Sequence, residues 1–273
     1  MEIRDKIKRV QELRLMDDVF FEVFATDVVA IQEILRTILE DDDLIVEDVI
    51  VQSSERNLYG RSVRLDALCT LGNGSKCNIE VQRANNDNHL KRARFNASVI
   101  TARESNVNDR FEDVLELYII YISESDFLHG GLTIYHVDKT IRENGTLIDD
   151  GLHEVFVNTE VKDGSRISDL MSCFMSKEVN SIEFPAVTRR FNELKNEGGV
   201  LTVCDVMEKY MAEARAEGRA EGRAEGSIEA KKAERVETIR KMLGKGLSKD
   251  FIKSLDYKDD EIKEAEDSLM ALA

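Results

Sequence analysis

The sequence contains few cysteines, and their spacing matches no metal-binding or redox motif. The four cysteines among 273 residues form no C-x-x-C pair, and no Cys–His set has the spacing of a zinc site. Cys69 and Cys77 lie on the two arms of a predicted hairpin and could be neighbours. We expect all four to be reduced and buried, as is usual in a cytoplasmic protein.

The chain also lacks a long hydrophobic run. No stretch of about 18 apolar residues occurs, which argues against a membrane-spanning helix. The first residues, MEIRDKIKRVQELRL, are charged throughout and have no apolar centre of the signal-peptide type. We therefore expect a cytoplasmic protein that has no membrane partner.

Positive charge is in deficit, because the formal net charge is -16. This balance argues against a protein that coats nucleic acid by bulk electrostatics, although it leaves room for a locally basic face beside an acidic metal site. Much of the acidity is concentrated in runs such as EDDDLIVEDV at residues 40–49, and such runs are usually solvated. Any binding to nucleic acid must therefore come from local basic residues and should be sensitive to salt.

Apolar residues are present in the amounts and periods that a mixed domain needs. They make up 42% of the chain, which is enough for one core and an appendage. Helical spacing is predicted at residues 10–24, 28–40, 86–105, 165–175 and 186–197, and strands at 44–52, 62–83 (a hairpin), 114–123, 132–138 and 153–161. The pattern predicts an α/β or α+β domain that ends near residue 200, and we place its boundaries at residues 1–204.

The composition changes after this domain. Residues 210–243 are almost entirely Ala, Glu, Gly, Arg and Lys with a four-residue repeat, and they predict a helix over residues 205–245. A four-residue repeat places like charges at i,i+4, where they repel each other on a helix. Each glycine in the helix interior lowers helix stability by about 1 kcal/mol relative to alanine. Two interpretations stay open: a solvated spacer helix, or a helix that makes the protein a homo-oligomer. Residues 246–273 predict a small helical tail.

One hairpin carries polar residues where buried strands are predicted. In RLDALCTLGNGSKCNIEVQR, residues 64–83, Asp66 lies on the first strand, and Glu80 and Gln82 share one face of the second. The turn decides whether these residues meet. A two-residue Asn73–Gly74 loop pairs Asp66 with Val81, on the wrong face. A three-residue loop, either residues 72–74 or residues 73–75, pairs Asp66 with Glu80 or Gln82.

With an odd-length loop, two carboxylates converge beside an amide. Two such carboxylates repel each other unless a cation lies between them. Mg²⁺ is the natural occupant because it prefers oxygen ligands and keeps several waters. An ion held by Asp66, Glu80 and the backbone carbonyl of Val81 could bind a phosphate oxygen and activate water. In the alternative interpretation, both acids lie at strand ends in solvent.

The hairpin resembles the core motif of the PD-(D/E)XK nuclease superfamily, and more narrowly its Rpn branch of recombination-promoting nucleases and putative transposases. That branch has an Asp on one strand and E-x-Q on the next, as do Asp66 and Glu80-Val81-Gln82. MDDVFFEVF, HLKRARFNASVI and VLELYIIYIS are similar to the family's opening helix and to the helix and strand after the motif. The Gly/Arg/Glu/Ala-rich helix and KGLSKDFIKSL are similar to family tails.

The resemblance implies an α/β fold with a restriction-endonuclease-like core, in which helices flank a central mixed β-sheet, and a C-terminal helical extension. It implies a Mg²⁺-dependent DNA endonuclease associated with recombination or mobile elements, in which Mn²⁺ can replace Mg²⁺. Asp66 and Glu80 would bind the metal. Gln82 stands where most of the superfamily has Lys, so it would orient water or a phosphate and leave deprotonation to the metal.

The resemblance extends to residues around the motif. An acid of the opening helix, Asp17 or Glu22, is a further candidate for binding the metal or a metal-bound water. The nearest basic cluster is expected to contact the DNA backbone, unless it is only an exposed helix face; it comprises Arg83, Lys91, Arg92 and Arg94. The competing hypothesis is a catalytically inactive DNA-binding or assembly protein that retains the nuclease fold.

Overall fold

The computed structural model describes residues 3–55, 63–83, 88–108 and 110–270. The chain divides into two compact units, Met1–Glu208 and Lys209–Ala273. The first contains the sheet and its helices, and the second contains a small helical core. None of the helices in the described ranges is both long enough and apolar enough to cross a membrane.

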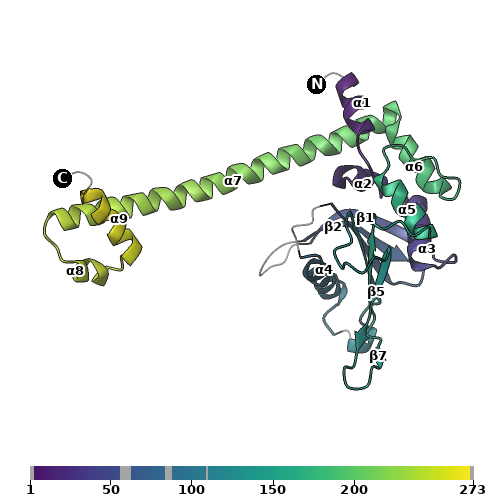
Figure 1. The fold of residues 1–273 in the computed structure, drawn as a ribbon, viewed down its shortest axis with the longest axis horizontal. Helices are drawn as coiled ribbons and strands as arrows, with labels where there is room; N and C mark the ends of the chain where they lie inside the picture. The colour runs from purple at the N-terminus through teal and green to yellow at the C-terminus, as the bar shows by residue number, and fades with distance from the viewer. Residues whose placement is uncertain (1–2, 56–62, 84–87, 109, 271–273) are drawn as a thin grey trace. The chain divides into compact units, whose positions relative to one another are not determined.

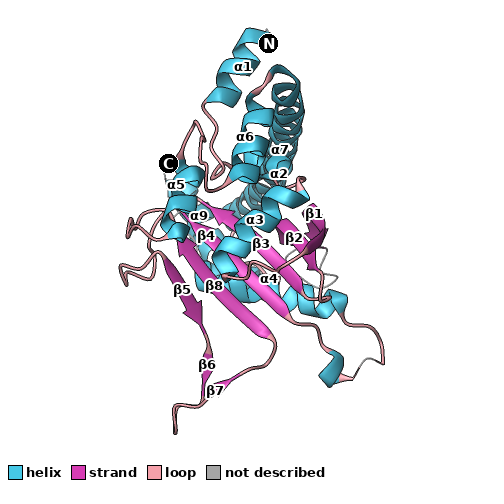
Figure 2. Cartoon of the chain, turned by 90° about the vertical axis from the view of Figure 1, so that its right-hand side faces the viewer, coloured by secondary structure: helices cyan, strands magenta, loops and turns pink. Residues whose placement is uncertain are grey.

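A six-stranded mixed sheet forms the centre of the first unit, in the order β1-β2-β3-β4-β8-β5 (Figure 2). Its strands are β1 Val46–Glu55, β2 Val63–Leu71, β3 Lys76–Gln82, β4 Leu117–Ser123, β5 Ile134–Val137 and β8 Leu152–Asn158. Strands β1, β2 and β3 are antiparallel, β3, β4 and β8 are parallel, and β5 returns antiparallel to β8. Two short strands, β6 Lys139–Thr140 and β7 Leu147–Ile148, form a separate ribbon. The mixed sheet confirms the predicted α/β fold.

Helices cover both faces of this sheet (Figure 1). The helices that precede α7 (Glu197–Gly244) are α1 Ile3–Gln11, α2 Asp18–Phe24, α3 Val28–Leu39, α4 His89–Glu104, α5 Arg166–Met175 and α6 Pro185–Lys195, with a 3₁₀ turn η1 at Phe111–Asp113. Side-chain oxygens of residues just before α3, α4 and α5 accept hydrogen bonds from the first turn, which fixes where these helices begin. These caps are Asp27, Asn88 and Ser165.

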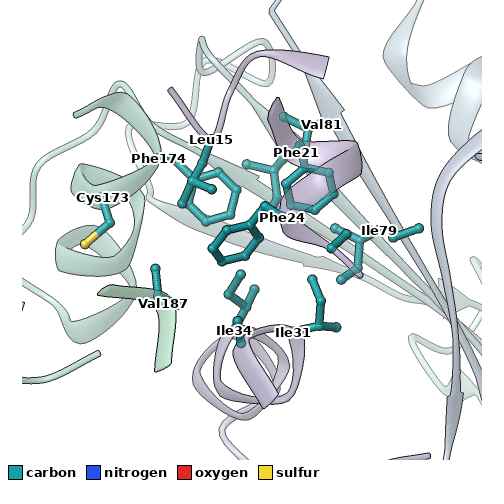
Figure 3. Packing of buried hydrophobic residues seen from close by; sticks show 14 of the residues in the cluster. Leu15, Phe21, Phe24, Ile31, Ile34, Ile79, Val81, Cys173, Phe174 and Val187 are labelled. Carbon is teal, nitrogen blue, oxygen red and sulfur yellow. The ribbon is translucent and has the colours of Figure 1, made fainter. Parts of the chain in front are cut away.

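The period-two alternation of β3 separates two cores. Cys77, Ile79 and Val81 point into the larger core, where they meet residues of α2, α3 and α5 such as Phe24 and Ile31 (Figure 3). Asn78 and Glu80 therefore point to the opposite face, where Leu68 of β2 and Tyr121 of β4 pack beneath α4. The polar residues of the motif thus lie between the sheet and α4.

The prediction of one helix over residues 10–24 is wrong, because the chain breaks between α1 and α2. Tertiary contacts hold this break. The backbone N–H of Met16 donates to the carbonyl of Phe174 in α5 at 3.2 Å, and Leu15 and Met16 are fully buried. Apolar periodicity continues through the segment because these residues enter the core without being helical.

The second unit is built from the end of α7 Glu197–Gly244, with α8 Lys249–Ser254 and α9 Asp259–Met270. Its core contains Ile239, Ile252, Ile262 and Ala265. Gly218, Gly222 and Gly226 lie within α7, and no described atom outside the helix lies within 4 Å of the position that a Cβ would take on them. Whether α7 is a spacer or associates with a second copy stays a prediction.

Candidate active site

The turn between β2 and β3 sets the register of the motif. Its loop is Gly72–Gly74, because the N–H of Leu71 donates to the carbonyl of Ser75 at 2.9 Å. Gly74 has a φ of +87°, whereas Asn73 has no positive φ, so this is not the two-residue turn that needs both. The ladder pairs Ala67 with Ile79 and Leu68 with Asn78. Continued by one residue, this register places Asp66 beside Glu80.

Asp66 is half-buried and is tied to the neighbouring strand. Its Oδ2 accepts a hydrogen bond from the backbone N–H of Val81 at 2.9 Å. In a strand, the N–H and C=O of one residue point to the same neighbour, and the next residue points to the other. The carbonyl of Gln82 accepts from Glu124 N on the β4 side at 3.0 Å, so the Val81 carbonyl faces β2. It therefore faces the strand that carries Asp66.

Glu80 is buried, with 1% of its surface exposed, and its two oxygens lie near an amide and a guanidinium. Asn78 Nδ2 donates to Oε1 at 3.0 Å, and Arg92 Nη2 of α4 lies 3.7 Å from Oε2. Arg92 Nη1 also donates to Gln82 Oε1 at 2.8 Å. One guanidinium therefore joins Glu80 and Gln82 on the face covered by α4.

The two carboxylates of the motif influence each other electrostatically. Burial, followed by the charge of Glu80, raises the pKa of Asp66 well above its usual value, and the Val81 N–H opposes this. Burial also raises the pKa of Glu80, against the hydrogen bond from Asn78 and the charge of Arg92. A site that disfavours two negative charges gains most from a cation or a shared proton.

A third acid, Asp18, was missed by the sequence analysis. It is exposed at the surface, and partial desolvation raises the pKa of its carboxyl. Its charge in turn contributes to the raised pKa of both Asp66 and Glu80, so it lies within electrostatic reach of the pair. The sequence offers two adjacent acids in MDDVFFEVF, Asp17 and Asp18. Which of them belongs to α2 depends on the residue at which this helix begins.

The two acids named from the sequence lie on the same segment, one before α2 and one within it. Asp17 precedes α2, where its Oδ2 accepts from the N–H of Arg14 at 2.7 Å and its other oxygen pairs with Arg83. Glu22 is half-buried, about one turn beyond Asp18 on α2. Of the acids on α2 and at its start, Asp18 is the one whose charge acts on both Asp66 and Glu80.

The predicted basic cluster divides into three environments. Arg83 forms ion pairs with Asp17 and Glu124. Arg92 lies over the acids. Lys91 and Arg94 are exposed and line a groove of about 770 Å³ beside α4, to which Phe111, 98% exposed, also contributes. Of the four residues of this cluster, Lys91 and Arg94 are therefore the two that form no ion pair with a described residue.

The oxygen atoms at the motif fit a hard divalent cation. The candidate ligands are the carboxylates of Asp66 and Glu80 and the carbonyl of Val81. Asn78 also lies beside these ligands, because its Nδ2 donates to Glu80. Asn78 is 0% exposed, and its Oδ1 has no hydrogen-bond partner among the described residues. Mg²⁺ prefers such oxygen ligands.

A different group of side chains that could hold a metal ion lies at the other end of the sheet. Ligand atoms of Glu116, Asp149 and His153 lie within 4.8 Å of one another. Glu116 and His153 flank the first residues of β4 and β8, whereas Glu80 lies near the end of β3. Glu116 and Asp149 are exposed, and Glu116 already pairs with His153 at 2.8 Å. This group is separate from the motif.

Comparison with protein families matches residues 14–163 to the PD-(D/E)XK nuclease family transposases. The chain belongs to this family. The match spans the sheet from β1 to β8 and contains Asp18, Asp66, Glu80 and Gln82, and nucleases of this family typically use divalent metals. Comparisons with curated proteins and with solved structures gave no match.

Proposed function

We propose that this PD-(D/E)XK transposase-family protein is a Mg²⁺-dependent DNA endonuclease associated with recombination or mobile elements. The observation that carries the proposal is the three-residue turn, which places Asp66 beside Glu80 and leaves the E-x-Q pair facing α4. Family membership supports the reaction class. Burial of the carboxylates supports the need for a cation.

Each residue of the site has a defined part in this proposal. Asp66, Glu80 and the Val81 carbonyl would hold the ion, which would supply Lewis acidity and a more acidic water when bound. Gln82 orients the attacking water or a phosphate oxygen, because an amide both donates and accepts but is no base at neutral pH. Asp18 would contribute negative charge near the ion, since its charge acts on both Asp66 and Glu80.

The DNA backbone is proposed to run along the outer side of α4. Lys91 and Arg94 are exposed there, and neither forms an ion pair with a described residue. Arg83 is already engaged by two acids, so its contact with DNA requires breaking these pairs. With a net charge of -16, affinity should depend steeply on salt, by about one power of salt concentration for each phosphate neutralised.

A cleavage assay tests the proposal. The purified protein should nick or cut plasmid DNA with Mg²⁺ or Mn²⁺ and not with EDTA. Asp66→Ala should abolish cleavage, whereas Asp43→Ala, which removes an exposed acid outside the motif, should not. Cleavage that persists in Asp66→Ala would assign the activity to a contaminant and refute the proposed site.

The alternative is a catalytically inactive DNA-binding or assembly protein on the same fold. One observation favours it: Asn78 and Arg92 already hold both oxygens of Glu80. This alternative predicts salt-sensitive DNA binding without cleavage with any divalent metal. We further propose self-association through α7, for which sedimentation of the full chain should give a mass above 31.0 kDa.

A further inference from the structure

Arg92 occupies a central position in the acidic site. It lies on α4 four residues before the buried Asn96, so its side chain emerges on the side of the helix that faces the sheet. Its Nη1 donates to Gln82 Oε1 at 2.8 Å, and its Nη2 lies 3.7 Å from Glu80 Oε2. Two different nitrogens of one planar group therefore contact the two polar residues of the E-x-Q motif.

The positive charge of Arg92 is shared by three acids. It acts to lower the pKa of Asp18, of Asp66 and of Glu80. Arg83 is among the leading causes at Asp18 but not at Asp66 or Glu80, so Arg92 is the described cation common to the leading causes at all three acids. Among the described residues, Arg92 is thus the counter-ion of the whole site.

The contacts of Glu80 with Asn78 and Arg92 are divided between its two oxygens, and the backbone N–H of Asp66 also donates to this carboxylate. Oε1 accepts from the buried amide of Asn78 at 3.0 Å, while Oε2 faces the guanidinium of Arg92 at the longer distance of 3.7 Å. The bond to Asn78 is fixed within β3, two residues apart on one face. The contact to Arg92 depends on a long flexible side chain of another element, which makes Oε2 the easier oxygen to release.

We propose that Arg92 is a resident counter-ion that holds Glu80 and Gln82 in the metal-free protein, and that a divalent ion binds Glu80 through Oε2 by displacing it. Asn78 keeps Oε1 throughout and so maintains the orientation of the carboxylate. The same displacement releases Gln82 from its bond to Arg92, so metal loading makes both E-x-Q side chains available together. The inference rests on the proposed metal-dependent function and adds a positioning residue to it.

Charge explains why the two cations exclude each other. Mg²⁺ binds oxygen at about 2.1 Å, so an ion on Oε2 would lie within a few ångströms of the guanidinium if Arg92 stayed in place. Like charges at such a distance in a partly buried site repel strongly, because the effective dielectric constant is far below that of water. Arg92 therefore weakens metal binding and must move when it occurs.

The most direct test follows Arg92 and Gln82 by NMR while Mg²⁺ is added to the full-length protein without DNA. The Arg92 Nε–H and the Gln82 side-chain amide should shift together with the Val81 N–H, and Asp66→Asn should remove all three shifts. If Mg²⁺ shifts the Val81 N–H while the Arg92 and Gln82 side chains do not respond, Arg92 is not displaced and the inference is refuted.

Metal affinity provides a second test. If Arg92 only supported the structure, its replacement would weaken metal binding, whereas a displaced counter-ion predicts tighter binding. In calorimetry without DNA, Arg92→Gln should bind Mn²⁺ about tenfold more tightly than the natural protein, since a like charge is removed. Arg94→Gln, the same substitution on the exposed side of α4, should leave the affinity unchanged. Equal or weaker binding by Arg92→Gln would overturn the inference.

A second variant serves if the first does not fold, and the results distinguish this inference from the proposed metal site. If Arg92→Gln does not fold, Arg92→Lys retains the charge but cannot contact Glu80 and Gln82 in the same forked way, and its Mn²⁺ affinity should rise by a smaller factor. Binding that requires Asp66 but is unaffected by Arg92 refutes this inference and leaves the metal site standing. Absence of any Asp66-dependent binding refutes both.

Discussion

Gly74 offers the sharpest test of the turn that aligns the site. Its φ of +87° is a conformation that costs an L-residue about 1–2 kcal/mol. Apart from its chain neighbours, no heavy atom of the described residues lies within 4 Å of the position that a Cβ would take. The penalty for Gly74→Ala is therefore conformational and not steric, and we expect a loss of about 1–2 kcal/mol in the free energy of unfolding.

Gly74→Asn is the matched control at the same position. Asparagine tolerates the left-handed region better than alanine does, so Gly74→Asn should lose less stability than Gly74→Ala, although it adds more atoms. Urea unfolding followed by far-UV circular dichroism measures both, and an unchanged slope with a lower midpoint marks a change in stability alone.

The opposite order would refute the reasoning. If Gly74→Ala is as stable as the natural protein, or if Gly74→Asn is the less stable of the two variants, Gly74 does not have a positive φ in solution. The three-residue loop would then lose its support, and with it the register that places Asp66 beside Glu80.

Three further predictions concern single groups. Asp66→Asn keeps an oxygen acceptor for the Val81 N–H and Asp66→Ala does not, so in urea unfolding Asp66→Ala should be less stable than Asp66→Asn by about 1–3 kcal/mol. The hydrogen bond from Arg235 lowers the pKa of the Glu261 carboxyl to about 2. The stabilisation from the ionised Glu261 is therefore complete above the ordinary pKa of a glutamate and is lost as the pH falls toward 2. NMR titration of the Glu261 carboxyl carbon should show a midpoint near 2, and a midpoint near 4 would contradict this prediction. Mg²⁺ at 100 times its dissociation constant should raise the free energy of unfolding by about 2.7 kcal/mol in the natural protein and leave Asp66→Asn unchanged; an equal rise in both would place the ion elsewhere.

Strand periodicity was enough to predict part of the site. Side chains alternate along a strand, so Glu80 and Gln82 had to share a face, and the structure shows one guanidinium contacting both. The register was not determined, because GNGS can form loops of two or three residues. The positive φ of Gly74 and the bond between Leu71 and Ser75 select one of the three-residue loops.

The remaining site residues depend on contacts that are distant in sequence. Asp18 is the first residue of α2, and that start follows from a break held by the hydrogen bond from Met16 to Phe174 of α5. Arg92 was grouped with exposed basic residues, since local sequence cannot show which cation of a helix covers a sheet. The burial of Ala93 and Asn96 decides that orientation, and it exists only once α4 has docked.

The central claim is that Asp66 and Glu80 hold one divalent ion. Anomalous diffraction from crystals soaked in Mn²⁺ tests it most directly. We predict a peak within about 2.5 Å of a carboxylate oxygen of Asp66 and of Glu80 Oε2, with Arg92 moved away. A peak only at Glu116, Asp149 and His153, or no peak beside Asp66 under conditions in which the protein cuts DNA, would contradict the account.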